Sequence, residues 1–357
     1  MHGRPIRHNP PVFASVRGVE ARIRSSTGGD PAPSRISSVA APAPRQARGV
    51  QLINGRSGLV LVRHRNHTGL DSNALKRAAQ RGELVRLRSG AYVRASTWTS
   101  LAPDDRIRLE VAAAEAVHRG GFIASHRSAA ALWGLPRVRR HDDLVHQRVS
   151  RATGNRTEHG IRKHAVEDLD LHLTTIDGIA VTDVDRTVLD LAATEPFSAA
   201  VAAADWALRQ HTTKERLQVC LDEWAPSRGR SRIQQVIDFA DGAAQGPGES
   251  ISRVQIFESG LTMPVLQQRF DDELGLIGFV DFYWPAFDLI GEFDGLLKYK
   301  EDRVMAGRSA GEVVSDEKMR EDRLRATDRQ PRVTRWVWAT LSPVGRLAAQ
   351  LRRAGLR

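Results

Sequence analysis

The stretch from Gly278 to Tyr299, GFVDFYWPAFDLIGEFDGLLKY, constrains the fold of this chain more than any other. Two short runs rich in aromatic and aliphatic residues, 276–283 and 287–294, flank a Trp-Pro break. Each run has the length and composition of a β-strand. Acidic residues stand inside and at the ends of these runs, where a buried strand is normally apolar. We therefore expect two paired strands that carry charge at one end.

The acids in these runs are Asp281, Glu292 and Asp294. Side chains two apart on a strand share a face, so Glu292 and Asp294 point the same way, and Asp281 faces them if the runs pair. Three such carboxylates repel one another and lose hydration, so they need a cation or a proton. Oxygen ligands favour Mg²⁺ or Mn²⁺ over zinc. The alternative is a solvated strand end, with Glu292 and Asp294 paired to Lys298 or the basic residues after it.

Composition narrows the class of protein and of partner. A chain of 357 residues is long enough for two or three domains, and its net charge of +11 favours a polyanionic partner such as DNA. No apolar run reaches the length of a membrane helix, and no secretory signal pattern is visible, so we expect no membrane partner. Cys220 is the sole cysteine, which excludes an intrachain disulfide and fits the cytoplasm.

Residues 1–48 are rich in proline and arginine and contain a single aromatic residue, Phe13. Such a segment cannot bury enough apolar surface to offset its ordering entropy, so we expect a disordered basic tail. The alternative is a start codon placed too far upstream.

Residues 52–98 have the outline of a winged helix-turn-helix domain. Asp71 or Ser72 is expected to cap a helix that ends at Arg81, and Gly82 follows as its stop signal. The sequence LVRLRSGAYV then predicts two strands around a Ser-Gly turn, the wing. A recognition helix and a wing on DNA need basic surfaces, although the same module can bind proteins instead. The residues expected to contact DNA are Asn73, Lys76, Arg77, Gln80, Arg81, Arg86 and Arg88.

Residues 104–243 are expected to be mostly helical, with strands near 144–149, 171–176 and 179–182. The histidines of this region show no helical ligand spacing and no supporting cysteine, so we interpret them as scattered and not as a metal site. They are His141, His146, His159, His164 and His172.

A Gly- and Pro-containing segment, 244–250, is expected to be a linker into the last domain, 246–357. That domain is expected to run helix, three strands, helix, strand, and then a terminal helix. The αβββαβ order, with an acid in the second strand and Glu-x-Asp in the third, resembles the PD-(D/E)XK nuclease superfamily. It is most similar to the branch related to very-short-patch repair endonucleases.

This resemblance implies a set of catalytic residues. Asp281 matches the motif aspartate, Glu292 the (D/E) position, and Glu249 the acid often found on the first helix. Asp294 stands where the motif has lysine, so another cation would have to serve; Lys298 is the nearest in sequence. Lys318, on the following helix, is a second candidate.

The front part, residues 55–240, resembles the winged-helix antitoxins of abortive-infection (type IV) toxin–antitoxin systems. The similarity rests on ALKRAAQRGELVRLRSGAYV, SHRSAAALWGLP and VTDVDRTVLDLA. It implies binding to double-stranded DNA and, under one interpretation, to a cognate toxin.

Two hypotheses follow for an α+β chain of this kind. The first is a Mg²⁺- or Mn²⁺-dependent DNA endonuclease, with Asp281, Glu292 and Asp294 on the metal, Lys298 near the phosphate and Glu249 in support. The second is a catalytically inactive transcriptional regulator or antitoxin that keeps the nuclease fold as a docking surface.

Overall fold

The computed structural model describes residues 58–61, 72–138, 144–295, 310–327 and 329–357. The chain divides into Met1–Gln46, all outside the described residues, and Ala47–Arg357. The expected disordered tail, the Asp71 cap and Lys298 therefore lie outside what is described. The mixed α+β class is confirmed. Among the described residues, no helix combines the length and the apolar composition of a membrane span.

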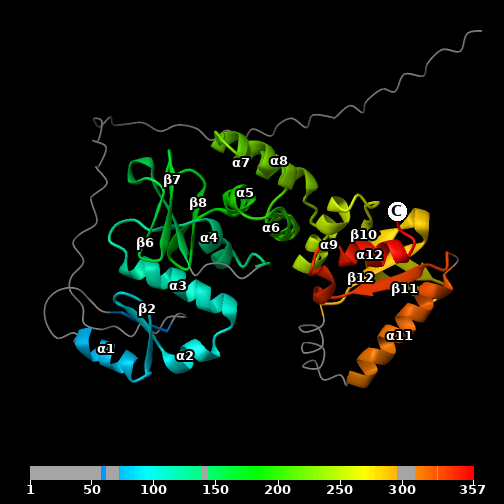
Figure 1. The fold of residues 1–357 in the computed structure, drawn as a ribbon, viewed down its shortest axis with the longest axis horizontal. Coiled ribbons are helices and arrows are strands. Elements are labelled where there is room, and N and C mark those ends of the chain that lie inside the picture. The colour runs from blue at the N-terminus through cyan, green and yellow to red at the C-terminus, as the bar shows by residue number, and fades with distance from the viewer. Residues whose placement is uncertain (1–57, 62–71, 139–143, 296–309, 328) are drawn as a thin grey trace, which may run out of the picture. The chain divides into compact units, whose positions relative to one another are not determined.

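In the first part of the chain a helix packs on a small sheet of strand order β1-β3-β2, whose Leu59, Ala91 and Val93 also pack against Leu109 and Ala113 of a later helix (Figure 1). Its helix buries Leu75 against Val60 and Tyr92, and this contact defines the inner face of the helix. Gly82, with φ of 76°, follows the helix in the left-handed conformation that favours glycine. The bounds are β1 Leu59–Leu61, α1 Ser72–Gln80, β2 Leu84–Arg88 and β3 Ala91–Arg94.

The middle region contains more strand than expected. Six strands form one mixed sheet of order β6-β7-β5-β4-β9-β8. Two helices precede its first strand: α2 Ala95–Ser100 and α3 Pro103–Val117. The strands are β4 Ile123–Ala124, β5 Val145–Ser150, β6 Arg156–Glu158, β7 Ile161–Val166, β8 Leu173–Ile176 and β9 Ile179–Thr182. The strands β4, β6 and β7 were not expected, so a full sheet accompanies the helices that the sequence predicted for this region.

Helices complete the middle region. They are α4 His126–Trp133, α5 Val184–Thr194, α6 Phe197–Gln210, α7 Lys214–Trp224 and α8 Arg230–Phe239. Small residues let α6 pack closely against its neighbours, with Ala200 and Ala204 fully buried in the largest core cluster. Asp205 on α6 accepts a hydrogen bond from the Arg253 guanidinium at 2.8 Å, and both side chains are buried. This ion pair joins the middle helices to the helix that opens the C-terminal region.

The C-terminal region follows the expected order of elements. It comprises α9 Pro247–Glu258, β10 Val265–Asp272, β11 Gly275–Trp284, β12 Leu289–Phe293, α11 Ala310–Ala326, β13 Arg332–Trp336 and α12 Arg346–Arg353. The sheet order is β10-β11-β12-β13, with only the β12–β13 pair parallel. The segment 244–250 is not the expected linker, because Ala244 and Ser250 are each 1% exposed and α9 begins within it.

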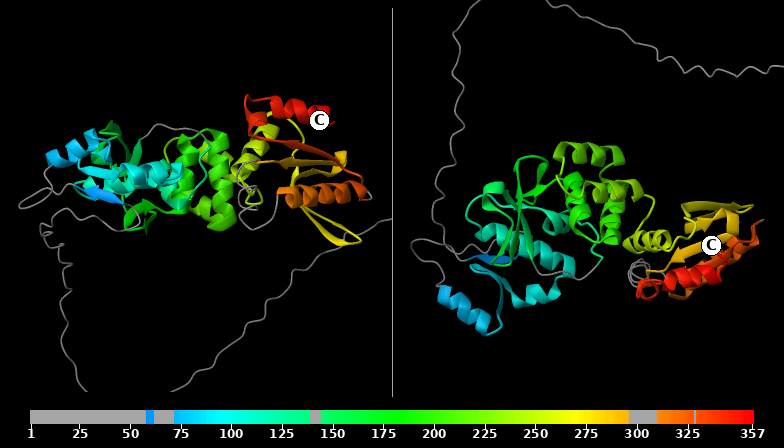
Figure 2. Two further views of the ribbon diagram at one scale, coloured as in Figure 1. Left: turned by 90° about the horizontal axis from the view of Figure 1, so that it is seen from below. Right: turned by 45° about the horizontal axis from the view of Figure 1, so that its top comes forward.

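Two apolar layers cover the two faces of this sheet. Phe282, Trp284 and Leu289 pack with α9 and α12, whereas Tyr283 and Ile290 pack with α11. Figure 2 shows α12 and α11 on opposite sides of the strands. Because strand side chains alternate, Asp281 and Glu292 lie on the same side as Tyr283 and Ile290, towards α11.

Gly291 occupies a position on β12 that has no room for a side chain. A Cβ atom there would lie 2.6 Å from Trp336 and 2.9 Å from Trp284, two rings that are almost fully buried. We expect Gly291→Ala to lower the free energy of unfolding by about 1–3 kcal/mol through overpacking, measured by urea denaturation with tryptophan fluorescence. Gly121→Ala is the matched control, since its Cβ would have no neighbour within 4 Å. A Gly291→Ala protein with the free energy of unfolding of the wild type would contradict this packing.

Candidate catalytic site

Polar side chains form a row across the four strands of the C-terminal sheet. The register pairs Phe282 with Gly291, which places Asp281 beside Glu292 on the adjacent strand. Glu292 is in turn paired with Arg335 on β13. Gln267 continues the row on β10, because its side-chain amide lies 3.4 Å from Asp281 Oδ1. The row therefore brings an amide, two carboxylates and a guanidinium to one face of the sheet.

Asp281 is held by the backbone as well as by this row. Its Oδ2 accepts a hydrogen bond from the Phe293 N–H at 2.8 Å, so the carboxylate bonds a β12 amide directly. Burial raises the pKa of Asp281 above its usual value, and the Phe293 N–H opposes that rise by stabilising the charged form.

Glu249 reaches the same place from the first turn of α9. Its Oε2 accepts from the Gln245 N–H at 2.8 Å, and the Gln267 amide nitrogen lies 3.5 Å from that oxygen. Burial, with the charge of Asp281 as the second cause, raises the pKa of Glu249 to about 7. Gln267 has a φ of 49°, an uncommon conformation for a non-glycine residue, and its amide contacts both carboxylates. Neither carboxylate has an ion-pair partner among the described residues.

Glu292 is neutralised differently. Arg320 on α11 donates to Glu292 Oε1 at 2.9 Å, and Arg335 donates to Oε2 at 2.8 Å. Asp294 lies just beyond β12, is exposed, and donates its backbone N–H to the Trp336 carbonyl. The additional carboxylate near Asp281 is therefore that of Glu249, which comes from α9, and not that of Asp294. No group of three or more His, Cys, Asp or Glu side chains in the described ranges is arranged to hold a metal.

Neither lysine proposed to replace the motif lysine is found in this row of polar side chains in the described part of the chain. Lys298 lies outside the described residues, and Lys318 is exposed on α11. The two arginines on Glu292 had no signal in the local sequence pattern. The alternation of β13 could have indicated Arg335, had its register with β12 been known.

The surface expected to contact DNA is largely exposed. The outward side chains of α1 and the strand that follows are exposed at Asn73, Lys76, Arg77, Gln80, Arg81 and Arg86. Arg88 differs, because its guanidinium donates to the His159 and Gly160 carbonyls at 3.0 and 3.3 Å. Burial also lowers its pKa. We therefore leave Arg88 out of the proposed interface, since it ties the hairpin to the middle sheet.

Three histidines of the middle region are packed together and not scattered. His146 Nδ1 and His164 Nε2 lie 2.9 Å apart, and the His126 ring stacks on His164 at 3.5 Å between centroids. Burial lowers the pKa of His126 to about 3, of His146 to about 2 and of His164 to about 3. The rings therefore remain neutral at physiological pH. His159 and His172 are not in this stack, and His141 lies outside the described residues.

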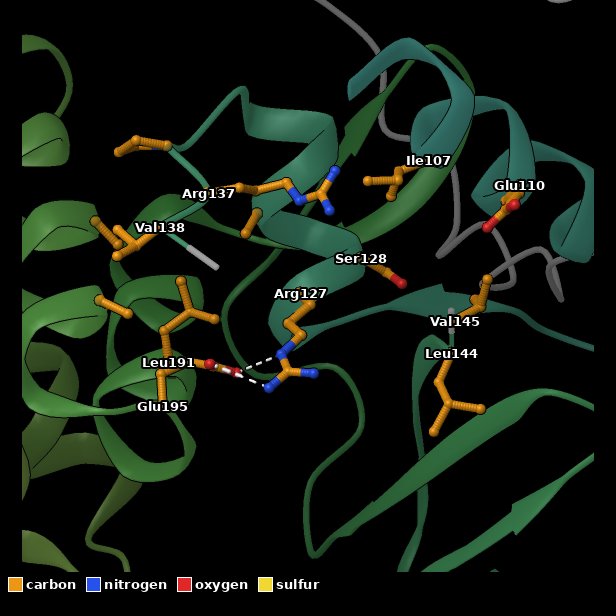
Figure 3. Close-up of a pocket in the computed structure, with 14 residues that line it drawn as sticks. Ile107, Glu110, Arg127, Ser128, Arg137, Val138, Leu144, Val145, Leu191 and Glu195 are labelled. Atoms are coloured by element: carbon orange, nitrogen blue, oxygen red, sulfur yellow. Dashed lines mark hydrogen bonds and ion pairs between the residues drawn. The ribbon is translucent and has the colours of Figure 1, made fainter. Parts of the chain in front are cut away.

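A partly open pocket is lined by residues of α3, α4, β5, α5 and α6 (Figure 3). Arg127 on its wall donates to both carboxylate oxygens of Glu195, one of them at 3.1 Å. The cavity is about 70 Å³, less than half of a cavity known to admit benzene. It is too small for a nucleotide or a comparable substrate.

No family model matches the chain. Two curated proteins from two strains of Mycobacterium tuberculosis, both described as uncharacterized, are 25% identical to it over 219 residues. The matched region covers 59% of this chain and 77% of each relative. The similarity places the chain near proteins without a described activity, so the proposal of function rests on the site itself.

We expect Glu249→Gln to stabilise the metal-free protein above neutral pH. The folded state keeps a proton that the unfolded state releases between the ordinary pKa of 4.5 and the raised value of about 7, so stability is lost across that window as pH rises. Glutamine removes this loss, which amounts to at most about 3 kcal/mol. Urea denaturation in a chelator should show a gain at pH 8 and none at pH 4.

The control for this prediction is Glu258→Gln, an exposed glutamate at the other end of α9. A gain from Glu249→Gln that does not depend on pH would contradict the assigned proton.

Proposed function

We propose that this chain binds double-stranded DNA through its front module and hydrolyses DNA phosphodiesters with its C-terminal region, in a reaction that depends on Mg²⁺ or Mn²⁺. The observation that carries the proposal is the pair of carboxylates of Asp281 and Glu249, which lie 3.4 and 3.5 Å from the same Gln267 amide nitrogen. Two adjacent carboxylates with raised pKa values, and no ion-pair partner in the described structure, call for a cation.

Asp281 and Glu249 are proposed to hold the metal through their carboxylate oxygens. Glu292, whose two oxygens each accept a hydrogen bond from an arginine, would lie beside the ion. The bound ion would polarise the scissile phosphate, lower the pKa of the attacking water and offset the transition-state charge. The Gln267 amide contacts both carboxylates and would keep them oriented, and Glu249 would give up its proton on binding a cation.

The proposed DNA surface is the outward face of α1 together with the hairpin that follows it. Lys76, Arg77 and Arg81 are exposed there, while Leu75 holds the opposite face of the helix in the core. Such a helix presents several cations to phosphates without strain in its packing. The winged-helix assignment remains part of the proposal.

The first test is cleavage of supercoiled plasmid with Mg²⁺, with Mn²⁺ and with chelator. We expect nicking with metal only, and Asp281→Asn should lower its rate by about 100-fold or more, because a carboxylate that carries the cation is lost. Asp271→Asn is the matched control, since Asp271 lies on the same sheet but pairs with Arg269 at the surface. Nicking in chelator, or at an unchanged rate by Asp281→Asn, would contradict the proposal.

The second test concerns DNA affinity. We expect the triple variant Lys76→Gln, Arg77→Gln, Arg81→Gln to bind duplex DNA more weakly. The slope of log binding constant against log salt concentration should become shallower by about 0.9 for each lost phosphate contact. Fluorescence anisotropy over a range of salt concentrations measures both quantities.

The matched control neutralises three arginines on α12, Arg346, Arg352 and Arg353, and removes the same charge elsewhere. Equal losses in the two triple variants would place the interface outside the front module.

A second candidate function is a DNA-binding regulator or antitoxin without catalysis. Asp294 in the motif lysine position and the double arginine contact on Glu292 favour it, because both reduce the resemblance to an active nuclease. A protein whose melting temperature rises with Mn²⁺ but which never cleaves DNA would support this candidate over the first.

A further inference from the structure

A lysine two residues after Glu292 would lie on the same strand and face, about 6.6 Å further along the strand. Asp294 fills that position here. Neighbouring strands lie closer than this, about 4.8 Å apart, so a residue opposite Glu292 on the next strand is at least as well placed. The residue opposite Glu292 on β13 is Arg335.

The contacts of Arg335 fix its guanidinium against the row of polar residues. Its Nε donates to Glu292 Oε2 at 2.8 Å, and its Nη1 donates to Glu321 on α11. Glu321 also pairs with Arg325 one helical turn later. The strand register and two carboxylates hold the Arg335 guanidinium in place. Its side chain is 33% exposed, so the guanidinium lies at the rim of the site.

Arg320 makes a different set of contacts. It donates to Glu292 Oε1 and, at 2.8 Å, to the Phe279 carbonyl, and thereby fastens α11 to β11. With one arginine on each oxygen, the plane of the Glu292 carboxylate is set. Each oxygen keeps a further lone pair for another partner.

We propose that Arg335 supplies, from the neighbouring strand, the positive charge that the Glu-x-Lys pattern lacks at Asp294, and that it positions Glu292 for phosphodiester hydrolysis. This inference rests on the proposed nuclease function. It makes Arg335 a positioning residue whose charge is needed in the transition state, when the scissile phosphate gains negative charge. It also gives a reason why the site tolerates an acid at residue 294.

The test compares the full-length wild type with Arg335→Gln, Arg335→Lys and the control Arg332→Gln. Arg332 is a second arginine of β13 that contacts the Phe287 carbonyl, outside the row. Three quantities are measured: kcat for plasmid nicking, KM for DNA, and the rise of melting temperature with Mn²⁺.

For Arg335→Gln we expect kcat to fall by about 100-fold, as for loss of one charge-stabilising donor, with KM within about 3-fold. Its response to Mn²⁺ should be at least as large as that of the wild type, because the carboxylates remain and a competing cation is gone. Arg335→Lys should recover most of kcat, and Arg332→Gln should match the wild type.

Nicking by Arg335→Gln at the wild-type rate would overturn the inference and leave the proposed nuclease standing. If the melting temperature of both Arg335 variants no longer rose with Mn²⁺, the inference would be overturned too, because the arginine would then be needed for the folded structure of the site. A wild type that never nicks DNA would instead contradict the proposed function, and the inference would fall with it.

Discussion

A carboxylate on the face of a covered sheet loses most of its hydration, and the arrangement of the C-terminal region follows from that cost. Three acids meet it in three ways. Glu292 accepts hydrogen bonds from two guanidinium groups, and Asp281 accepts one from the Phe293 N–H. The pKa of Glu249 is raised by burial to about 7, so this residue keeps a proton. The Gln267 amide contacts the last two. A divalent cation that replaces the proton on Glu249 would compete with the Gln267 amide for the oxygens of Glu249 and Asp281, so this pair is where we propose the centre of the site.

The sequence predicted the C-terminal elements closely because each has a strong local signal. Alternating apolar residues indicate β11 and β12. Pro247 is a typical first residue of a helix and begins α9, although we expected it in a linker. The strands that were missed have weak signals: β4 is two residues long, and β7 reads IRKHAV, with charge in place of alternation. Their pairing partners, β5 and β9, supply the hydrogen bonds that the local sequence does not indicate.

Asp281 and Glu292 lie side by side as strand alternation predicted, whereas Asp294 is exposed beyond β12 and not beside them as expected, and the partners of the acids were not predicted. Asp281, Glu292 and Glu249 followed from strand alternation and from the resemblance, whereas Arg320 and Arg335 come from elements that are 28 and 43 residues away in sequence from Glu292. Contacts at that separation depend on strand register and helix packing. The same limit applies to His126, His146 and His164, which are spread over three elements and converge only in the folded middle sheet.

The central claim, that Glu249 and Asp281 share a divalent cation, is tested most directly by crystals grown with Mn²⁺ and measured near the manganese absorption edge. The account predicts one anomalous difference peak at coordination distance from oxygens of Glu249 and Asp281, with Glu292 still in contact with Arg335. It also predicts that the peak is absent from crystals of Asp281→Asn. Fully ordered side chains with no peak between them in the wild type, at a Mn²⁺ concentration that supports DNA cleavage, would contradict it.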